Sequence, residues 1–130
     1  MEILENEVSR IAIGAAMEVH TALGPGLLER AYKECLFHKL QKLGISAEKE
    51  KSVPLIFEDV KLQCGYRIDL LVEGILVIEI KSVAAISEVH LAQTINYMKL
   101  GNYKVGLLIN FNVVRLKEGI RRVVNGPYPL

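Results

Sequence analysis

The first part of the chain carries hydrophobic residues at helical spacing. Between Leu4 and Leu23, apolar side chains recur every three or four positions, which is the pattern of an amphipathic helix. Gly24-Pro25-Gly26 then ends this helix, because glycine adopts positive φ and proline cannot continue the hydrogen-bond ladder. A second helix is predicted from Leu27 to Leu43, and Gly44 follows it as a stop signal.

The pattern then changes to one typical of strands. Val53 to Phe57 predicts a short strand, and Glu58-Asp59 predicts a turn after it. Two further strands are expected at Tyr66–Val72 and Leu76–Val83. The Glu73-Gly74 pair between them is a strong signal for a hairpin.

The remainder of the chain predicts one more helix and at least one more strand. Ser87 is placed to cap a third helix that ends at Gly101. Tyr103–Phe111 is mostly apolar, as a strand covered on both faces would be. Leu116–Val124 fits either a last strand or a short helix.

The order of these elements defines the fold class. A helix that joins two strands indicates a crossover and parallel pairing, beside an antiparallel hairpin. We therefore predict an α/β fold with a mixed four- or five-stranded sheet flanked by helices, and a single domain over residues 1–130.

Composition narrows the classes of function. The 130 residues are 51% hydrophobic, which excludes global disorder. The net charge of +1 excludes a strongly basic coat, so polyanion binding requires a local patch. Six per cent aromatic residues and no tryptophan argue against a stacking platform for single strands. The acidic N-terminus and the short uncharged stretch Val105–Val114 predict a soluble, cytoplasmic protein without a membrane partner.

The strongest candidate chemistry lies in the predicted hairpin. Glu79 and Lys81 are two positions apart on a strand, so they share one face, while Ile78 and Ile80 point the other way. An ion pair on a solvated sheet face is the simpler interpretation. If Asp69 lies opposite Glu79, however, two carboxylates and an ammonium come together. Such oxygen ligands suit Mg²⁺ or Mn²⁺, which can polarise a phosphodiester while a lysine orients water.

This site requires a particular strand register. A plain two-residue turn at Glu73-Gly74 would pair Asp69 with Ile78 and place Glu79 on the wrong face. Only an odd loop, such as Glu73-Gly74-Ile75, or a bulge at Gly74 sets Asp69 opposite Glu79. We predict the odd register.

Other polar residues are open to two interpretations. Glu29 lies on or beside the buried stripe of the second helix, either as a solvated boundary residue or as a further carboxylate that reaches toward the pair. Gln93 and Tyr97 form a polar strip on the third helix, which suits either contact with phosphate or with the site carboxylates, or ordinary surface polarity. A basic cluster near the C-terminus is either a phosphate-contacting patch or a solvated face: Arg115, Lys117, Arg121 and Arg122.

The sequence lacks the motifs of several other kinds of metal, catalytic and phosphate-binding site. The two cysteines, Cys35 and Cys64, cannot form a four-thiolate metal site by themselves and are expected to be small apolar core residues. The three histidines have no spacing typical of a zinc site, and neither a Gly-x-Ser-x-Gly elbow nor a phosphate-cradling loop is present.

The ordered set of motifs resembles a known family. Gly26-Leu27-Leu28-Glu29-Arg30-Ala31-Tyr32 matches the GxxExxY signature. Further matching segments follow in the expected order: Asp69, Glu79-Ile80-Lys81, Gln93-Thr94-Ile95-Asn96-Tyr97 and Leu107-Leu108-Ile109-Asn110-Phe111. Over roughly Val8 to Asn125, the chain thus resembles the GxxExxY proteins, a family similar to the PD-(D/E)XK, or restriction-endonuclease-like, superfamily.

The resemblance implies a restriction-endonuclease-like core, a mixed four-stranded sheet flanked by helices. It also implies roles for individual residues: Glu29 as the helix carboxylate, Asp69 and Glu79 as metal ligands together with the Ile80 carbonyl, Lys81 as the catalytic lysine, and Gln93 with Tyr97 as the QxxxY helix of the exonuclease-like branch. Ile68 departs from the pattern, because the family motif has proline before the aspartate.

Two classes of function are compatible with these residues. The first is a nuclease, a hydrolase that uses Mg²⁺ or Mn²⁺ to cut nucleic acid, expected to be DNA, by in-line attack of water. The alternative is a non-catalytic module that keeps the nuclease fold and binds nucleic acid or protein. A structure-specific nuclease such as a junction resolvase is a third hypothesis, which requires a homodimer. DNA and RNA substrates, and cutting internally or from an end, are all compatible with the sequence.

Overall fold

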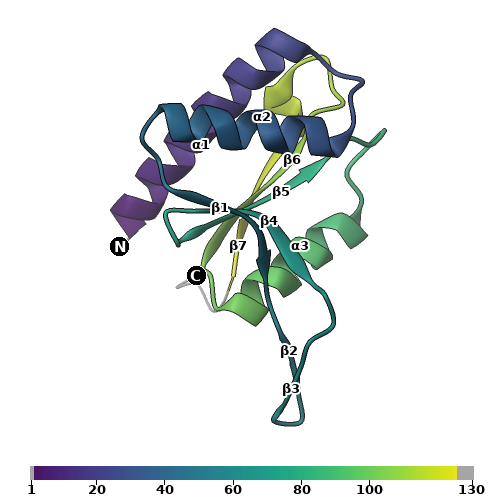
Figure 1. Ribbon diagram of the computed structural model, residues 1–130. Helices are drawn as coiled ribbons and strands as arrows, with labels where there is room; N and C mark the ends of the chain where they lie inside the picture. The colour runs from purple at the N-terminus through teal and green to yellow at the C-terminus, as the bar shows by residue number, and fades with distance from the viewer. Residues whose placement is uncertain (1, 126–130) are drawn as a thin grey trace.

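The computed structural model describes residues 2–125 (Figure 1). Two helices come first, α1 (Glu2–Leu23) and α2 (Glu29–Lys42). The other elements follow in this order: β1 (Ala47–Ser52), β2 (Leu55–Phe57), β3 (Val60–Leu62), β4 (Arg67–Val72), β5 (Leu76–Lys81), α3 (Glu88–Gly101), β6 (Val105–Asn110), the 3-10 turn η1 (Leu116–Gly119) and β7 (Ile120–Val124).

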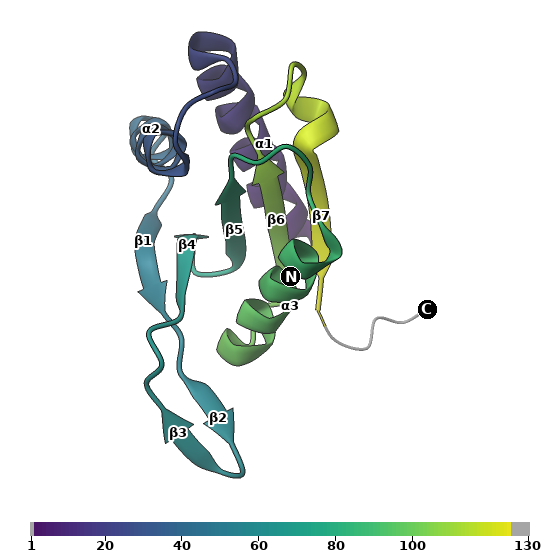
Figure 2. The same ribbon diagram turned by 90° about the vertical axis from the view of Figure 1, so that its right-hand side faces the viewer.

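Five of the strands form one mixed sheet in the order β1-β4-β5-β6-β7 (Figure 2). Strands β5 and β6 are parallel, and α3 makes the crossover between them. The other neighbouring pairs, β1 with β4, β4 with β5 and β6 with β7, are antiparallel. The predicted mixed α/β sheet, with its parallel crossover beside an antiparallel hairpin, is therefore confirmed.

Helices cover both faces of this sheet, with α1 and α2 on one side and α3 on the other (Figure 1). Under α1 and α2, Ile78 and Ile80 of β5 pack into one apolar cluster with Tyr32. Under α3, Val77 packs into a second cluster with Met98. Strand β5 is thus buried on both faces, and alternation places Glu79 on the α3 face, where a polar residue is unexpected.

The edge strand β1 is the main element that hydrophobic patterning did not predict. Its sequence, Ala-Glu-Lys-Glu-Lys-Ser, has no apolar alternation and is largely exposed. It pairs with β4 over Ala47 to Ser52, so main-chain hydrogen bonds, which any sequence can make, define it. The strand predicted at Val53–Phe57 begins two residues later, at β2, and belongs to a separate hairpin with β3. The Glu58-Asp59 turn between them is confirmed, with φ values of 49° and 65°. Cys64, between β3 and β4, is exposed, so the prediction that it lies in the core is wrong.

The loop between α1 and α2 is held by the tyrosine of the Gly26–Tyr32 segment. The Tyr32 hydroxyl donates to the Gly24 carbonyl at 2.6 Å and accepts from the Leu27 N–H at 3.1 Å. Its ring stacks on Phe111, just beyond β6, with centroids 4.5 Å apart. Gly26 takes φ of 99°, a conformation that strongly favours glycine. These contacts fix the start of α2 against the sheet.

Candidate active site

The loop between β4 and β5 sets the register that the site requires. The paired residues are Leu70 with Ile78, Leu71 with Val77, and Val72 with Leu76, which leaves the three-residue loop Glu73-Gly74-Ile75. Glu73 and Gly74 both have positive φ, at 54° and 68°. One further step along this register puts Asp69 opposite Glu79. The predicted odd register is therefore confirmed.

The sheet is interrupted on both sides of Asp69. The β4–β5 ladder ends at Leu70 and Ile78. The β1–β4 ladder skips one position, where flanking pairs would set Glu50 beside Asp69, and Glu50 has a positive φ of 55°. Backbone N–H groups that a regular ladder would have used are consequently free to bind side chains.

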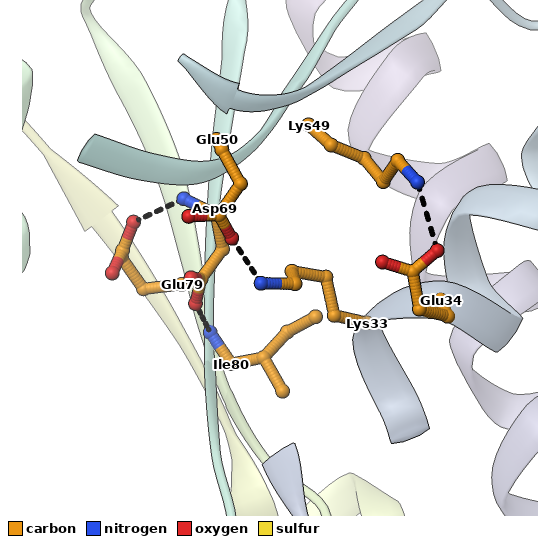
Figure 3. A network of polar contacts seen from close by, with 7 residues as sticks. All are labelled: Lys33, Glu34, Lys49, Glu50, Asp69, Glu79 and Ile80. Carbon is orange, nitrogen blue, oxygen red and sulfur yellow. Dashed lines mark hydrogen bonds and ion pairs between the residues drawn. The ribbon is translucent and has the colours of Figure 1, made fainter. Parts of the chain in front are cut away.

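The two carboxylates bind these backbone groups reciprocally. The Asp69 N–H donates to Glu79 Oε2 at 3.0 Å, and the Ile80 N–H donates to Asp69 Oδ2 at 2.8 Å (Figure 3). Each side chain is therefore held by the strand that carries the other one. Among residues 2–125, the second oxygens, Asp69 Oδ1 and Glu79 Oε1, accept no hydrogen bond from the protein. These two oxygens remain for a ligand.

Burial makes this pair of carboxylates difficult to ionise. Glu79 is only 4% exposed. Burial, reinforced by the charge of Asp69, raises the pKa of Glu79 from its ordinary 4.5 to about 8. Burial also raises the pKa of Asp69, against the opposing effect of the Ile80 hydrogen bond. Near neutral pH the two carboxylates therefore retain a proton that a bound cation would displace.

Lys81 links the end of β5 to α3. Its Nζ donates to Gln93 Oε1 at 3.2 Å, so both side chains lie on the α3 face of the sheet. Tyr97, one turn further along α3, is half-buried, and burial followed by the charge of Glu79 raises its pKa. The structure thus brings Gln93 and Tyr97 to the same face as the carboxylates, as expected for a polar strip that faces a site.

Glu29 contacts the backbone after Lys81 rather than the two carboxylates. It is the exposed first residue of α2, and its Oε2 accepts from the Ser82 N–H at 3.2 Å. The Ser82 hydroxyl in turn donates to the Leu27 carbonyl at 2.6 Å. No direct hydrogen bond joins Glu29 to Asp69 or Glu79 in the described chain. Glu29 therefore holds the segment that follows Lys81.

Two residues that the sequence analysis did not single out lie beside Asp69. Lys33 reaches from α2 and forms an ion pair with Glu50 of β1 (Figure 3). The Lys33 charge lowers the pKa of Asp69, while the Glu50 charge raises it. The available signal was weak: Lys33 stands four residues after Glu29 on α2, but Glu50 lies on the strand that no hydrophobic pattern predicted.

The predicted basic patch lies elsewhere on the sheet. Arg121 and Arg122 are exposed on β7, which β6 separates from β5. The Arg121 guanidinium donates to the carbonyls of Glu118 and Ile120, and that of Arg122 to Asn6 of α1. In the described part of the chain, neither guanidinium is hydrogen-bonded to a side chain of the candidate site.

The oxygen donors fit a hard divalent cation. Across residues 2–125, no group of three or more His, Cys, Asp or Glu side chains is placed to hold a metal. Mg²⁺ needs no such group, because it commonly binds one or two carboxylates and keeps several waters. The Ile80 carbonyl also faces β4, since the N–H and C=O of one strand residue point to the same side. Two carboxylates and one carbonyl therefore converge on the interrupted ladder.

Comparison with known proteins agrees with this geometry. A family model described as the PD-(D/E)XK nuclease superfamily matches residues 6–123. A search of curated proteins gave no match. No helix within residues 2–125 is both long and apolar enough to cross a membrane. With its restriction-endonuclease-like α/β sheet and a family match over nearly its whole length, the chain belongs to the PD-(D/E)XK nuclease superfamily.

Proposed function

We propose that this protein is a metal-dependent nuclease of a single domain that hydrolyses phosphodiester bonds in DNA. The observation that carries the proposal is the interrupted ladder between β4 and β5, where Asp69 lies opposite Glu79. Lys81 follows Glu79 by two residues on the same strand face. Within the superfamily, the Gly26–Tyr32 segment favours the GxxExxY branch.

The carboxylates are the proposed metal ligands. Asp69, Glu79 and the Ile80 carbonyl would hold Mg²⁺ or Mn²⁺, which polarises the phosphodiester and lowers the pKa of attacking water. Placing the buried Glu79 and the half-buried Asp69 next to the apolar clusters of the sheet is unfavourable for folding, which supports a functional reason for their presence.

Lys81 is the proposed catalytic lysine. Its ammonium would orient the attacking water and stabilise the charge that develops on the phosphate. Gln93 is a positioning residue, because it accepts a hydrogen bond from Lys81 Nζ. Glu29 has a similar role through Ser82, since it holds the backbone directly after Lys81.

Substrate contacts are proposed at two places. Tyr97 lies on the α3 face beside the carboxylates, where it can meet the nucleotide that is cut. Arg121 and Arg122 are exposed cations on β7, two strands away from β5, and they are proposed to contact phosphates away from the cut. If two copies bind one branched substrate, the protein acts as a homodimer.

A cleavage assay tests the proposal directly. Wild-type protein and Asp69→Ala are incubated with labelled single-stranded, double-stranded and branched DNA and with RNA, in Mg²⁺ or Mn²⁺. Glu48→Ala serves as the control, because it removes one exposed carboxylate from the neighbouring strand β1. We expect metal-dependent cutting by wild type and Glu48→Ala and none by Asp69→Ala. Equal cutting by all three would refute the site. Binding without cutting by any of them would favour the non-catalytic module.

A further inference from the structure

An open cavity of about 570 Å³ lies between α3 and the base of the β2–β3 hairpin. Its residues include Leu55, Tyr66, Gln93, Asn96, Tyr97 and Leu100. Gln93 and Tyr97 also belong to the α3 strip of the candidate active site, so the two are continuous. We propose that this cavity binds an unpaired nucleobase, stacked on Tyr66 with its edge toward the tilted ring of Tyr97, and that single-stranded or frayed DNA is therefore the preferred substrate. This inference rests on the proposed nuclease function.

The two tyrosine rings supply a stacking surface. Their centroids are 5.7 Å apart and their planes are inclined by 45°. Tyr66 is 41% exposed, so part of its ring is available for a ligand. Its backbone is fixed, because its carbonyl accepts from the Val53 N–H at 3.0 Å. Aromatic rings of this kind bind bases without sequence preference, since every base has a π-face.

The remaining lining suits a nucleotide. Leu55 and Leu100 provide apolar surface for a base, while the Gln93 and Asn96 amides offer donors and acceptors to its edge. Gln93 is also bound to Lys81 Nζ, so the cavity and the proposed catalytic lysine share one residue. We expect a nucleotide with its base in the cavity to direct its phosphate toward Lys81, because Gln93 lines the cavity and contacts that lysine.

The geometry selects against intact duplex. A base within a duplex is stacked on both faces and paired at its edge, so it must leave the helix to reach an aromatic pocket. The low aromatic content predicted no stacking platform, but composition does not report position. Two of the five tyrosines meet at this one place, which makes a pocket for one base rather than an extended platform.

The test compares binding of the full chain to a single-stranded oligonucleotide and to the blunt duplex of the same sequence. Fluorescence anisotropy is measured with Ca²⁺ in place of Mg²⁺ for wild type, Tyr66→Leu, Tyr66→Phe and Phe57→Leu. We expect Tyr66→Leu to raise the Kd for the single strand about tenfold, because one stacking contact is lost. The Kd for the duplex should not change. Tyr66→Phe should bind as wild type, since it keeps the ring. Phe57→Leu, which removes a 61% exposed aromatic from β2, should also have no effect.

Oligonucleotides that each lack one base then identify the position whose base occupies the cavity. One abasic position should weaken binding by wild type about as much as Tyr66→Leu does, and should not weaken binding by that variant further. The inference fails if Tyr66→Leu affects both substrates equally, if no position is sensitive, or if wild type binds no single strand. Cleavage that needs Asp69 but not Tyr66 would keep the proposed function and overturn the pocket. Binding to single strands that depends on Tyr66, without any cleavage, would keep the pocket and overturn the proposed function.

Discussion

Two sets of charged residues lie close together at the β1 side of the sheet (Figure 3), but the pKa of a carboxylate is lowered in one set and raised in the other. The exposed pair joins Glu34 of α2 to Lys49 of β1 at 2.8 Å, and this hydrogen bond lowers the pKa of Glu34. The buried pair consists of Glu79 and the half-buried Asp69, and burial raises the pKa of Glu79 to about 8. Burial, rather than the presence of charge, therefore distinguishes the candidate site from ordinary surface polarity.

The two places differ in how well the ionised form of a carboxylate is stabilised. Water and a nearby cation satisfy the exposed carboxylate, so its ionised form is stable without a ligand. In the described chain, Asp69 and Glu79 each accept one backbone N–H, and the charges nearby are those of Lys81 and of Lys33, whose ammonium is paired with Glu50. A divalent cation would offset the repulsion between the ionised forms of Asp69 and Glu79, as proposed above, whereas Glu34 already has a cation in Lys49.

The largest expected effect is the loss of cleavage activity when Glu79 is neutralised, compared with the same change at Glu34. Glu79→Gln should reduce metal-dependent cleavage by at least about a hundredfold, because a ligand charge is lost at the reacting phosphate. Glu34→Gln should leave the cleavage rate unchanged. Initial rates under saturating Mg²⁺ measure both. If the two variants lost activity equally, the contrast between buried and exposed carboxylates would not explain function.

Stability should also depend on pH through the buried pair. Because the folded-state pKa of Glu79, about 8, lies above its ordinary value of 4.5, the folded protein holds a proton that the unfolded chain releases. The free energy of unfolding of the metal-free protein should therefore fall as pH rises from about 4.5 to about 8. The expected loss is on the order of a few kcal/mol. Urea unfolding in EDTA across this range measures it.

Glu79→Gln and added metal give the controls for this pH dependence. The variant has no carboxylate to ionise at that position, so its stability should change less between these pH values. Mn²⁺ added to wild type above pH 8 should recover much of the loss, because it binds the ionised carboxylates in the folded state only. A wild-type curve that is flat or rises over this range would contradict the assignment of a raised pKa.

A smaller effect is expected from Lys33, which lies between the two sets of charges. Its ammonium stands beside Asp69, where it opposes a second cation. Lys33→Met should bind Ca²⁺ several-fold more tightly at pH 9, which is above the pKa of about 8 of Glu79. Calorimetric titration measures the Kd, and Lys49→Met is the matched control on the exposed pair. Weaker binding by Lys33→Met would show that the lysine supports the metal site instead.

Much of the buried site follows from the sequence because strand geometry has a strict period of two. Asp69, Glu79 and Lys81 share a face only with an odd loop, and Glu73 and Gly74 adopt the positive φ that this loop needs. The cap of α3 is similarly local, since the Ser87 side chain accepts from the His90 N–H within one turn. Such features depend on neighbours in the chain.

The parts that the sequence did not predict depend on partners distant in the chain. Glu50 reaches the site because β1 pairs with β4, and the charged sequence of β1 carries no periodic signal. The contact of Glu29 with Ser82 spans more than fifty residues and requires the packing of α2 on the sheet. Helical spacing places Glu29 near the buried stripe but does not identify its partner.

The smallest expected effect belongs to the exposed pair itself. Lys49→Met breaks the ion pair with Glu34, while the new side chain can still cover the Phe37 ring that the Lys49 ammonium now faces at 4.7 Å. Tm should shift by a few degrees at most (about 4 °C), and less in 1 M salt, because solvent already screens this pair. Cleavage should be unchanged. A large loss of stability that salt does not diminish would mean that charge pairing at β1 supports the sheet as strongly as burial does, and would remove the distinction between the two places.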